Sequence, residues 1–400
     1  MTAMAGGIPR LVPWSGPALF AYGFRPFFLA AAAWACTALL LWLASLAHGL
    51  PLPSAMAPLA WHAHEMLFGF AMAAVAGFML TAIPNWTGRL PLSGRPLAAL
   101  AGLWLVGRLA TVTSAWIGAV PGAVLDLAFP LALLAVVLRE VAVGRNWRNL
   151  PVCAGAALLL VANLLTQLEP LGLADATGLG QRLAIGTLAM LVALIGGRII
   201  PSFTTNALRR QGEARLPAPF GRLDKAVLAA SLVAILAWVA TPERAATGIL
   251  LVLAGLGHGL RLARWRPLTT RGEPLLWVLL LGYAWLALGL VLLGADALRG
   301  TFGQHLHALT AGCFPTMILA VMSRATLGHT GRELKADRAT TAAYLLVSLG
   351  ALARVAAHAF PAVYLPMVSA AGLAWLLGFV LFLAVYGPML LRPRPDGRPG

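Results

Sequence analysis

Two histidine pairs with the same His-x-His spacing are the residues of this sequence most suited to chemistry. His62 and His64 form the first pair, and His305 and His307 form the second. Both pairs lie in apolar surroundings, where an ionisable side chain normally marks a cofactor, a pathway or a paired structural site. Residues two apart on a helix point about 200° apart, so one pair is suited to two neighbouring sites rather than to one metal ion.

One imidazole from each of two packed helices gives an iron porphyrin its two axial ligands and a dry pocket for the ring. We therefore interpret the four histidines as cofactor ligands; the alternative is that they only sit in the headgroup region. Glu65 lies three residues after His62, where it can orient that imidazole or carry protons. Arg108 and Arg354 can each hold a haem propionate, or instead snorkel to the headgroups.

The composition decides what kind of protein positions these residues. Of the 400 residues, 60% are hydrophobic and 10% are charged, whereas roughly 25% are charged in ordinary globular chains. The chain is therefore expected to lie in a lipid bilayer. Its net charge of +16 would suggest nucleic acid as a partner of a soluble protein, but cytoplasmic loops of membrane proteins collect Lys and Arg. We accordingly expect no nucleic-acid partner.

Apolar stretches long enough to cross about 30 Å of hydrocarbon predict an all-α, polytopic membrane protein with about twelve helices. We expect these helices near 27–48, 61–83, 96–116, 120–142, 150–169, 181–203, 223–241, 246–264, 274–294, 304–326, 339–358 and 364–390. With both termini in the cytoplasm, 24 of the 29 Lys and Arg fall in cytoplasmic segments, which strongly favours this orientation. Six of the eight histidines then lie at outer helix ends: His48, His62, His64, His305, His307 and His358.

An internal repeat relates the two histidine pairs. A shift of 243 positions places the second helix on the tenth over 28 residues without a gap, and 8 of these are identical, including both histidines and a closing Thr-Gly-Arg. A shift of 117 places the second helix on the sixth, where Gln181 replaces His64. We interpret this as three four-helix units, near 24–145, 146–270 and 271–392, each with one equivalent helix toward a common axis or cofactor region.

Several local motifs resemble those of the NnrS family. The resemblance covers most of the chain, and its motifs are Gly23-Phe24-Arg25-Pro26-Phe27-Phe28, Trp61-His62-Ala63-His64-Glu65-Met66, Ile83-Pro84-Asn85-Trp86-Thr87-Gly88-Arg89, Gly197-Arg198-Ile199-Ile200-Pro201 and Leu327-Gly328-His329-Thr330-Gly331-Arg332. It implies a haem- and copper-containing protein of the bacterial inner membrane, linked to nitric oxide through denitrification or resistance to nitrosative stress.

A more distant architectural similarity is to the catalytic subunit of haem-copper oxidases and nitric oxide reductases. It implies that His62 or His64 and one histidine of the tenth helix bind a haem, that the other tenth-helix histidine binds a reactive haem, and that Arg354 holds a propionate. The chain departs from that pattern because no histidine occurs between His64 and His258. Copper would therefore need other ligands, such as His48, His358 or the spare member of a pair.

Together these observations predict a membrane haem protein that binds or turns over nitric oxide at an outer-side site, with His64 and His307 as the favoured axial pair. The electron donor is not identified by the sequence. The alternatives are a twelve-helix secondary transporter, which internal repeats also suit, and a metal- or cofactor-handling partner of denitrification enzymes. Neither a Walker A motif nor a dinucleotide-binding fingerprint occurs.

Overall fold

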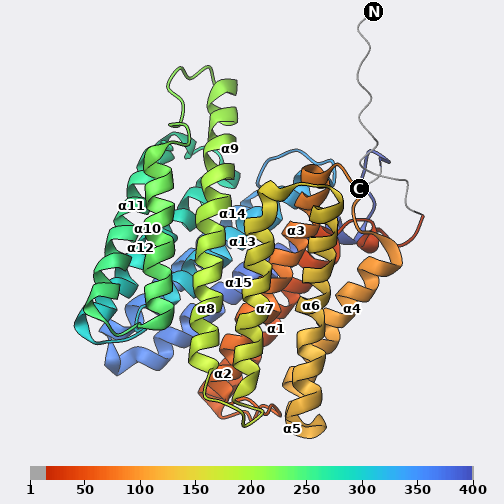
Figure 1. Ribbon diagram of the computed structural model, residues 1–400. Coiled ribbons are helices and arrows are strands. Elements are labelled where there is room, and N and C mark those ends of the chain that lie inside the picture. The colour runs from red at the N-terminus through yellow and green to blue at the C-terminus, as the bar shows by residue number, and fades with distance from the viewer. Residues whose placement is uncertain (1–14, 399–400) are drawn as a thin grey trace, which may run out of the picture.

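The computed structural model describes residues 15–398, apart from the side chains of Asn85 and Trp86 in one of the family-like motifs. Every regular element in this part of the chain is a helix, and twelve helical spans are long and apolar enough to cross a membrane. The prediction of an all-α, polytopic membrane protein with twelve helices is therefore confirmed. Figure 1 shows the long helices running side by side, with short connections at both ends.

We number the spans from first to twelfth in chain order. Nine consist mainly of one α-helix: α1 (Phe24–His48), α4 (Gly94–Val112), α6 (Ala119–Val143), α7 (Leu150–Leu168), α10 (Arg222–Ala240), α11 (Ala245–Ala263), α12 (Pro274–Arg299), α14 (Arg338–Ala356) and α15 (Tyr364–Leu391). Short elements join some of them: α5 (Ser114–Ile117) and the 3-10 turns η1 (Ala18–Phe20), η3 (Trp147–Asn149), η5 (Pro267–Thr270), η7 (Ala357–Ala359) and η8 (Pro361–Val363).

The second, sixth and tenth spans are built differently, because each contains a π-helical segment. The second consists of α2 (Pro58–His64), η2 (Glu65–Ala71) and α3 (Met72–Thr87); the sixth of α8 (Thr177–Leu191), η4 (Val192–Gly196) and α9 (Gly197–Arg210); and the tenth of η6 (Ala308–Cys313) and α13 (Phe314–His329). Single π-turns inside α-helices are frequent at functional sites. The sequence predicts each of these spans as an ordinary helix, and the π-turns are a finding of the structure.

The internal repeat is visible in where these π-turns lie. A shift of 243 positions places η2 on η6, since 65–71 becomes 308–314, directly after the histidine pair in both spans. When the shift of 117 positions places the second span on the sixth, η4 falls after the positions aligned with η2. The structure thus supports the match between the second and tenth spans, whereas the division into three four-helix units stays a prediction.

The first and last spans close the helical assembly. Helix α1 packs against α15, and the guanidinium of Arg25 is fully buried between them. It donates hydrogen bonds to the carbonyl oxygens of Met389, Leu390 and Arg392 at 2.8–3.1 Å. The last carbonyls of a helix lack partners within the helix, so this arginine caps α15.

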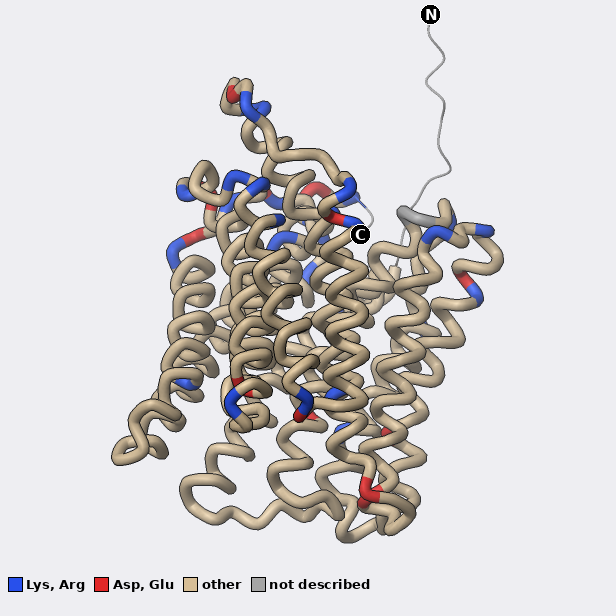
Figure 2. Tube along the Cα trace, turned by 60° about the vertical axis from the view of Figure 1, so that its left-hand side comes forward, with Lys and Arg blue, Asp and Glu red and all other residues tan. Residues whose placement is uncertain are grey.

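Charged residues are distributed unevenly between the two ends of the helices. Lys and Arg gather mainly at the end where α1 begins and α15 ends, as Figure 2 shows for the described residues. Positive charge collects on the cytoplasmic side of membrane proteins. The orientation with both termini in the cytoplasm stays a prediction. The opposite end, which we call the outer end, contains α2 and α5 in Figure 1.

Candidate functional site

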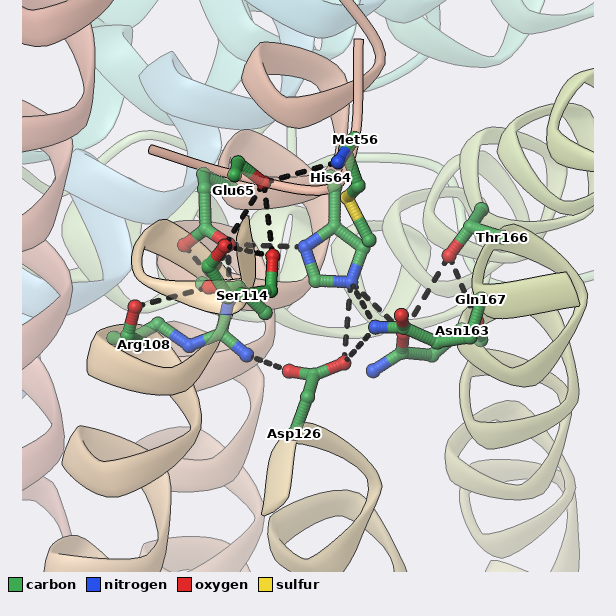
Figure 3. Close-up of polar contacts among 12 residues, drawn as sticks. Met56, His64, Glu65, Arg108, Ser114, Asp126, Asn163, Thr166 and Gln167 are labelled. Atoms are coloured by element: carbon green, nitrogen blue, oxygen red, sulfur yellow. Dashed lines mark hydrogen bonds and ion pairs between the residues drawn. The ribbon is translucent and has the colours of Figure 1, made fainter. Parts of the chain in front are cut away.

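A cluster of buried charged residues lies beside the first histidine pair. His64, Glu65, Arg108 and Asp126 come from α2, η2, α4 and α6, and each is at most 1% exposed. Arg108 Nη1 donates to both Glu65 oxygens at 2.9 and 2.7 Å, and its Nη2 is paired with Asp126. Figure 3 shows the imidazole of His64 between the two carboxylates. We call these four residues the ionic cluster.

Neutral side chains from α1, α4 and α7 complete the hydrogen bonding of the ionic cluster. Trp34 Nε1 of α1 donates to Glu65 Oε2 at 2.7 Å, and Thr111 Oγ1 donates to Glu65 Oε1 at 2.8 Å. From α7, Gln167 Nε2 donates to Asp126 Oδ2 at 2.8 Å, and Asn163 Oδ1 lies 2.9 Å from His64 Nε2. Buried charges are tolerated when they are paired and hydrogen-bonded in this way.

The contacts of His64 indicate its charge. Nδ1 lies 3.0 Å from Glu65 Oε1, and Nε2 lies 3.2 Å from Asp126 Oδ2. A neutral imidazole carries hydrogen on only one ring nitrogen, so its other nitrogen would face a carboxylate with a lone pair. One donor, Gln167 Nε2, lies 3.3 Å from Nε2, farther than the amide oxygen of Asn163. We therefore treat His64 as an imidazolium, which balances two negative charges with two positive ones.

This arrangement does not favour the roles expected from the sequence for His64 and Arg108. An axial ligand needs a ring nitrogen with a free lone pair, and both nitrogens of His64 contact oxygen atoms. The guanidinium of Arg108 is engaged by two carboxylates rather than open to a propionate. Glu65 contacts Trp34, Arg108, Thr111 and His64 rather than His62, the imidazole that its spacing in the sequence suggested.

His62 and His307 have a different environment from His64. In each, the Nδ1 atom is buried without a hydrogen-bond partner, although neither residue as a whole is fully buried. The His62 ring is stacked on Trp42 of α1, with 4.6 Å between centroids and 14° between planes. His307 lies within electrostatic reach of His62 and of Arg354. One histidine of the second span therefore lies within electrostatic reach of one that directly precedes η6 of the tenth.

Three of the remaining predicted residues, Arg354, His358 and His305, form a rim near this pair. Arg354 Nη1 lies 3.1 Å from His358 Nε2, and the rings of His305 and His358 are 6.1 Å apart. His305 Nδ1 lies 2.6 Å from Asp296 Oδ1, which fixes its orientation. His48 is exposed at the end of α1. The two members of each pair have separate surroundings. The sequence places the second pair on a helix near 304–326, but His305 lies in a turn and the span begins at Ala308.

The donor set is compatible with a haem more readily than with a metal ion held by protein alone. Within residues 15–398, no group of three or more His, Cys, Asp or Glu is arranged to hold a metal ion. A haem iron takes four ligands from the porphyrin and needs only one imidazole on each face. Two unpartnered imidazole nitrogens from packed spans meet that need. A copper site formed by His48, His358 or a spare pair member stays a prediction.

Tryptophans hold the π-turns that follow the two histidine pairs. Trp104 Nε1 donates to the Gly69 carbonyl in η2 at 3.0 Å, and Trp375 Nε1 donates to the Ala311 carbonyl in η6 at 3.2 Å. The aligned glycines, Gly69 and Gly312, each lie against an indole, and a Cβ there would come within 2.4–2.6 Å of it. Both positions therefore require glycine for close approach.

A second buried polar group lies apart from the histidine pairs. Both ring nitrogens of His258 are hydrogen-bonded. Nε2 lies 2.9 Å from Ser231 Oγ, and Nδ1 lies 2.7 Å from Tyr283 Oη. Arg261 donates to the same Tyr283 oxygen at 2.5 Å and to Asp224 at 3.0 Å. The sequence reasoning did not identify this group or Asp126, although an ionisable residue within an apolar stretch is a usable signal.

The comparison with known families agrees with the resemblance found in the motifs. The family model described as NnrS protein matches residues 18–394. No curated protein matches the chain.

Proposed function

Because the chain belongs to the NnrS family, we propose that it binds haem near the outer end of the second and tenth spans, and that nitric oxide is the ligand of this site. We further propose that it resides in the bacterial inner membrane with both termini in the cytoplasm. The gathering of Lys and Arg at the end that carries the termini supports this orientation. The proposed role is in the response to nitric oxide or in its detoxification.

One observation carries the proposal. His62 and His307 each have a buried Nδ1 atom without a hydrogen-bond partner, and they are close enough to interact electrostatically. Burying an unpaired polar atom costs roughly 1–3 kcal/mol. A ligand that used these two imidazoles would recover part of this cost. We therefore choose His62 and His307 as the residues that would hold the haem, in place of His64 and His307.

The neighbouring residues have distinct tasks in this proposal. Stacking on Trp42 holds the ring plane of His62. Arg354 supplies a positive charge beside His307, suited to the carboxylates of a haem edge. Asp296 fixes His305 at the rim, and the ionic cluster fixes the start of η2, directly after the first histidine pair. Bound haem would supply an iron that exchanges electrons and that takes nitric oxide in place of one of the two imidazoles.

The test is an optical spectrum with pyridine haemochrome and metal analysis on detergent-purified protein, recorded with and without nitric oxide. We expect His62→Ala and His307→Ala to lose most of the haem absorbance while they remain folded. His48→Ala is the matched control, because it removes an exposed histidine at an outer helix end. Its spectrum should equal that of the wild type and shift with nitric oxide.

Two results would contradict the proposal. If His64→Ala lost haem while His62→Ala kept it, the axial pair would be the one that the sequence favoured. If haem-supplied, well-folded wild type contained no haem, the cofactor itself would be excluded. The transporter and the cofactor-handling partner would then become the leading functions.

A further inference from the structure

An apolar pocket lies where the second, sixth and tenth spans meet. Its lining contains four residues of the second span, namely Ala74, Val75, Phe78 and Met79. The positions that the repeat aligns with these four also line the pocket. In the sixth span, 117 positions later, they are Leu191, Val192, Ile195 and Gly196. In the tenth span, 243 positions later, they are Met317, Ile318, Val321 and Met322. Three helices related by the repeat therefore present aligned positions to one space.

The chemistry of the lining excludes polar ligands. Apart from Gly196, every lining residue has a hydrocarbon, aromatic or thioether side chain, and none of them is ionisable. The pocket is partly open and has a volume of about 90 Å³. Apolar cavities of roughly 150 Å³ stay dry and bind benzene or xenon. A space of this size and polarity suits a small uncharged molecule, and it is too small for a porphyrin.

The position of the pocket indicates how such a molecule reaches it. Half-buried side chains, among them Val75, Phe78 and Val321, form part of the lining, on helices that lie within the hydrocarbon. We infer that a solute that prefers hydrocarbon to water reaches the pocket past these side chains without crossing a polar layer. Phe314 also lines the pocket and lies seven residues after His307, a rise of about 10 Å along a helix.

We propose that this pocket is a binding site for a small uncharged molecule that enters from the bilayer, the chemical class to which diatomic gases belong. The identification of that molecule as nitric oxide rests on the proposed function. The existence of the site is independent of the proposed function, because it is inferred only from the volume, the apolar lining and the position of the pocket. The site would hold the molecule on the helix that carries His307.

The first test uses xenon as the probe, on the full chain in lipid nanodiscs, with xenon NMR or xenon-pressurised crystals. We expect saturable binding in the pocket of the wild type and its loss in Val75→Phe and in Ala74→Phe, which place bulk into the space. Val124→Phe is the matched control, because it makes the same change at a lipid-facing position that is 63% exposed. The control should bind xenon as the wild type does.

Absence of xenon from the wild-type pocket, or binding that survives both filled variants, would overturn the proposal. A lipid chain occupying the pocket would overturn it as well. A second measurement addresses the nitric oxide step: the association rate of nitric oxide with bound haem should fall several-fold in Val75→Phe and stay unchanged in Val124→Phe. Loss of haem from the wild type would refute the proposed function, whereas the xenon result would still decide the site.

Discussion

Replacing Arg108 by glutamine tests the charge balance of the ionic cluster most directly. The wild-type cluster holds two carboxylates, one guanidinium and, by its contacts, one imidazolium. Arg108→Gln leaves a net negative charge at a site that is at most 1% exposed. Asp126→Asn leaves a net positive charge there. The double variant restores neutrality, so it should be more stable than either single variant.

The size of the effect follows from the two ion pairs that Arg108 makes. Two unit charges about 4 Å apart interact with about 4 kcal/mol at an effective dielectric constant of 20. Removing one partner of a buried pair typically destabilises a protein by about 3–5 kcal/mol, because the other charge stays buried. Each single variant should therefore lose roughly two to four orders of magnitude in its folding equilibrium constant. The double variant should lose about 1–3 kcal/mol, the scale of lost hydrogen bonds.

The assay is reversible unfolding in mixed micelles, followed by tryptophan fluorescence, with Glu140→Gln as a control that removes a partly exposed ion pair with Arg89. The control should cost less than about 1 kcal/mol. Additive losses in the double variant would refute the charge-balance argument. A stable Asp126→Asn variant would refute the positive charge on His64, since a neutral imidazole would leave that variant without net charge.

Three further predictions concern packing and capping. Gly312→Ala places a Cβ within 2.6 Å of the Trp285 ring, so we expect a loss of about 1–3 kcal/mol on thermal unfolding, relieved by adding Trp285→Leu. Tyr283→Phe removes the hydroxyl between His258 and Arg261 and should cost about 1–3 kcal/mol in the same assay; no change would show that water replaces it. Arg25→Gln should speed hydrogen exchange at the end of α15 but not of α14, and equal rates would contradict its capping role.

The number of spans and their approximate limits follow from the sequence, because the thickness of the hydrocarbon fixes how long an apolar helix must be. The π-turns do not follow from it. Gly69 and Gly312 fit an ordinary helix equally well, and only the indoles that approach them from other spans show why glycine is needed. The repeat aligns Gly69 with Gly312, but it does not explain why both residues are glycine.

The candidate site divides in the same way. The sequence identifies the histidines, and the structure shows His62 within electrostatic reach of His307. The sequence favours His64 as a haem ligand, but His64 and His307, which the repeat aligns, have different surroundings. The partners of His64 that decide its role, Asp126 and Asn163, lie 62 and 99 positions away in other spans. These contacts depend on how the helices pack, and the spacing of residues within one helix does not predict that packing.

The π-turn in the tenth span also bears on how this protein tolerates insertions and deletions. A π-turn holds one residue more than the α-helical turn it replaces. Deleting a single residue within Ala308–Cys313 would convert this wide turn to an ordinary α-helical turn and leave the residues on its two sides in nearly their present orientation. His307 and the pocket-lining part of α13 would then keep their directions. A deletion within the regular helix α13 would instead rotate the residues before it by about 100° relative to those after it. The π-turn is thus the place in this span where the loss of one codon disturbs the relation between the two sites least.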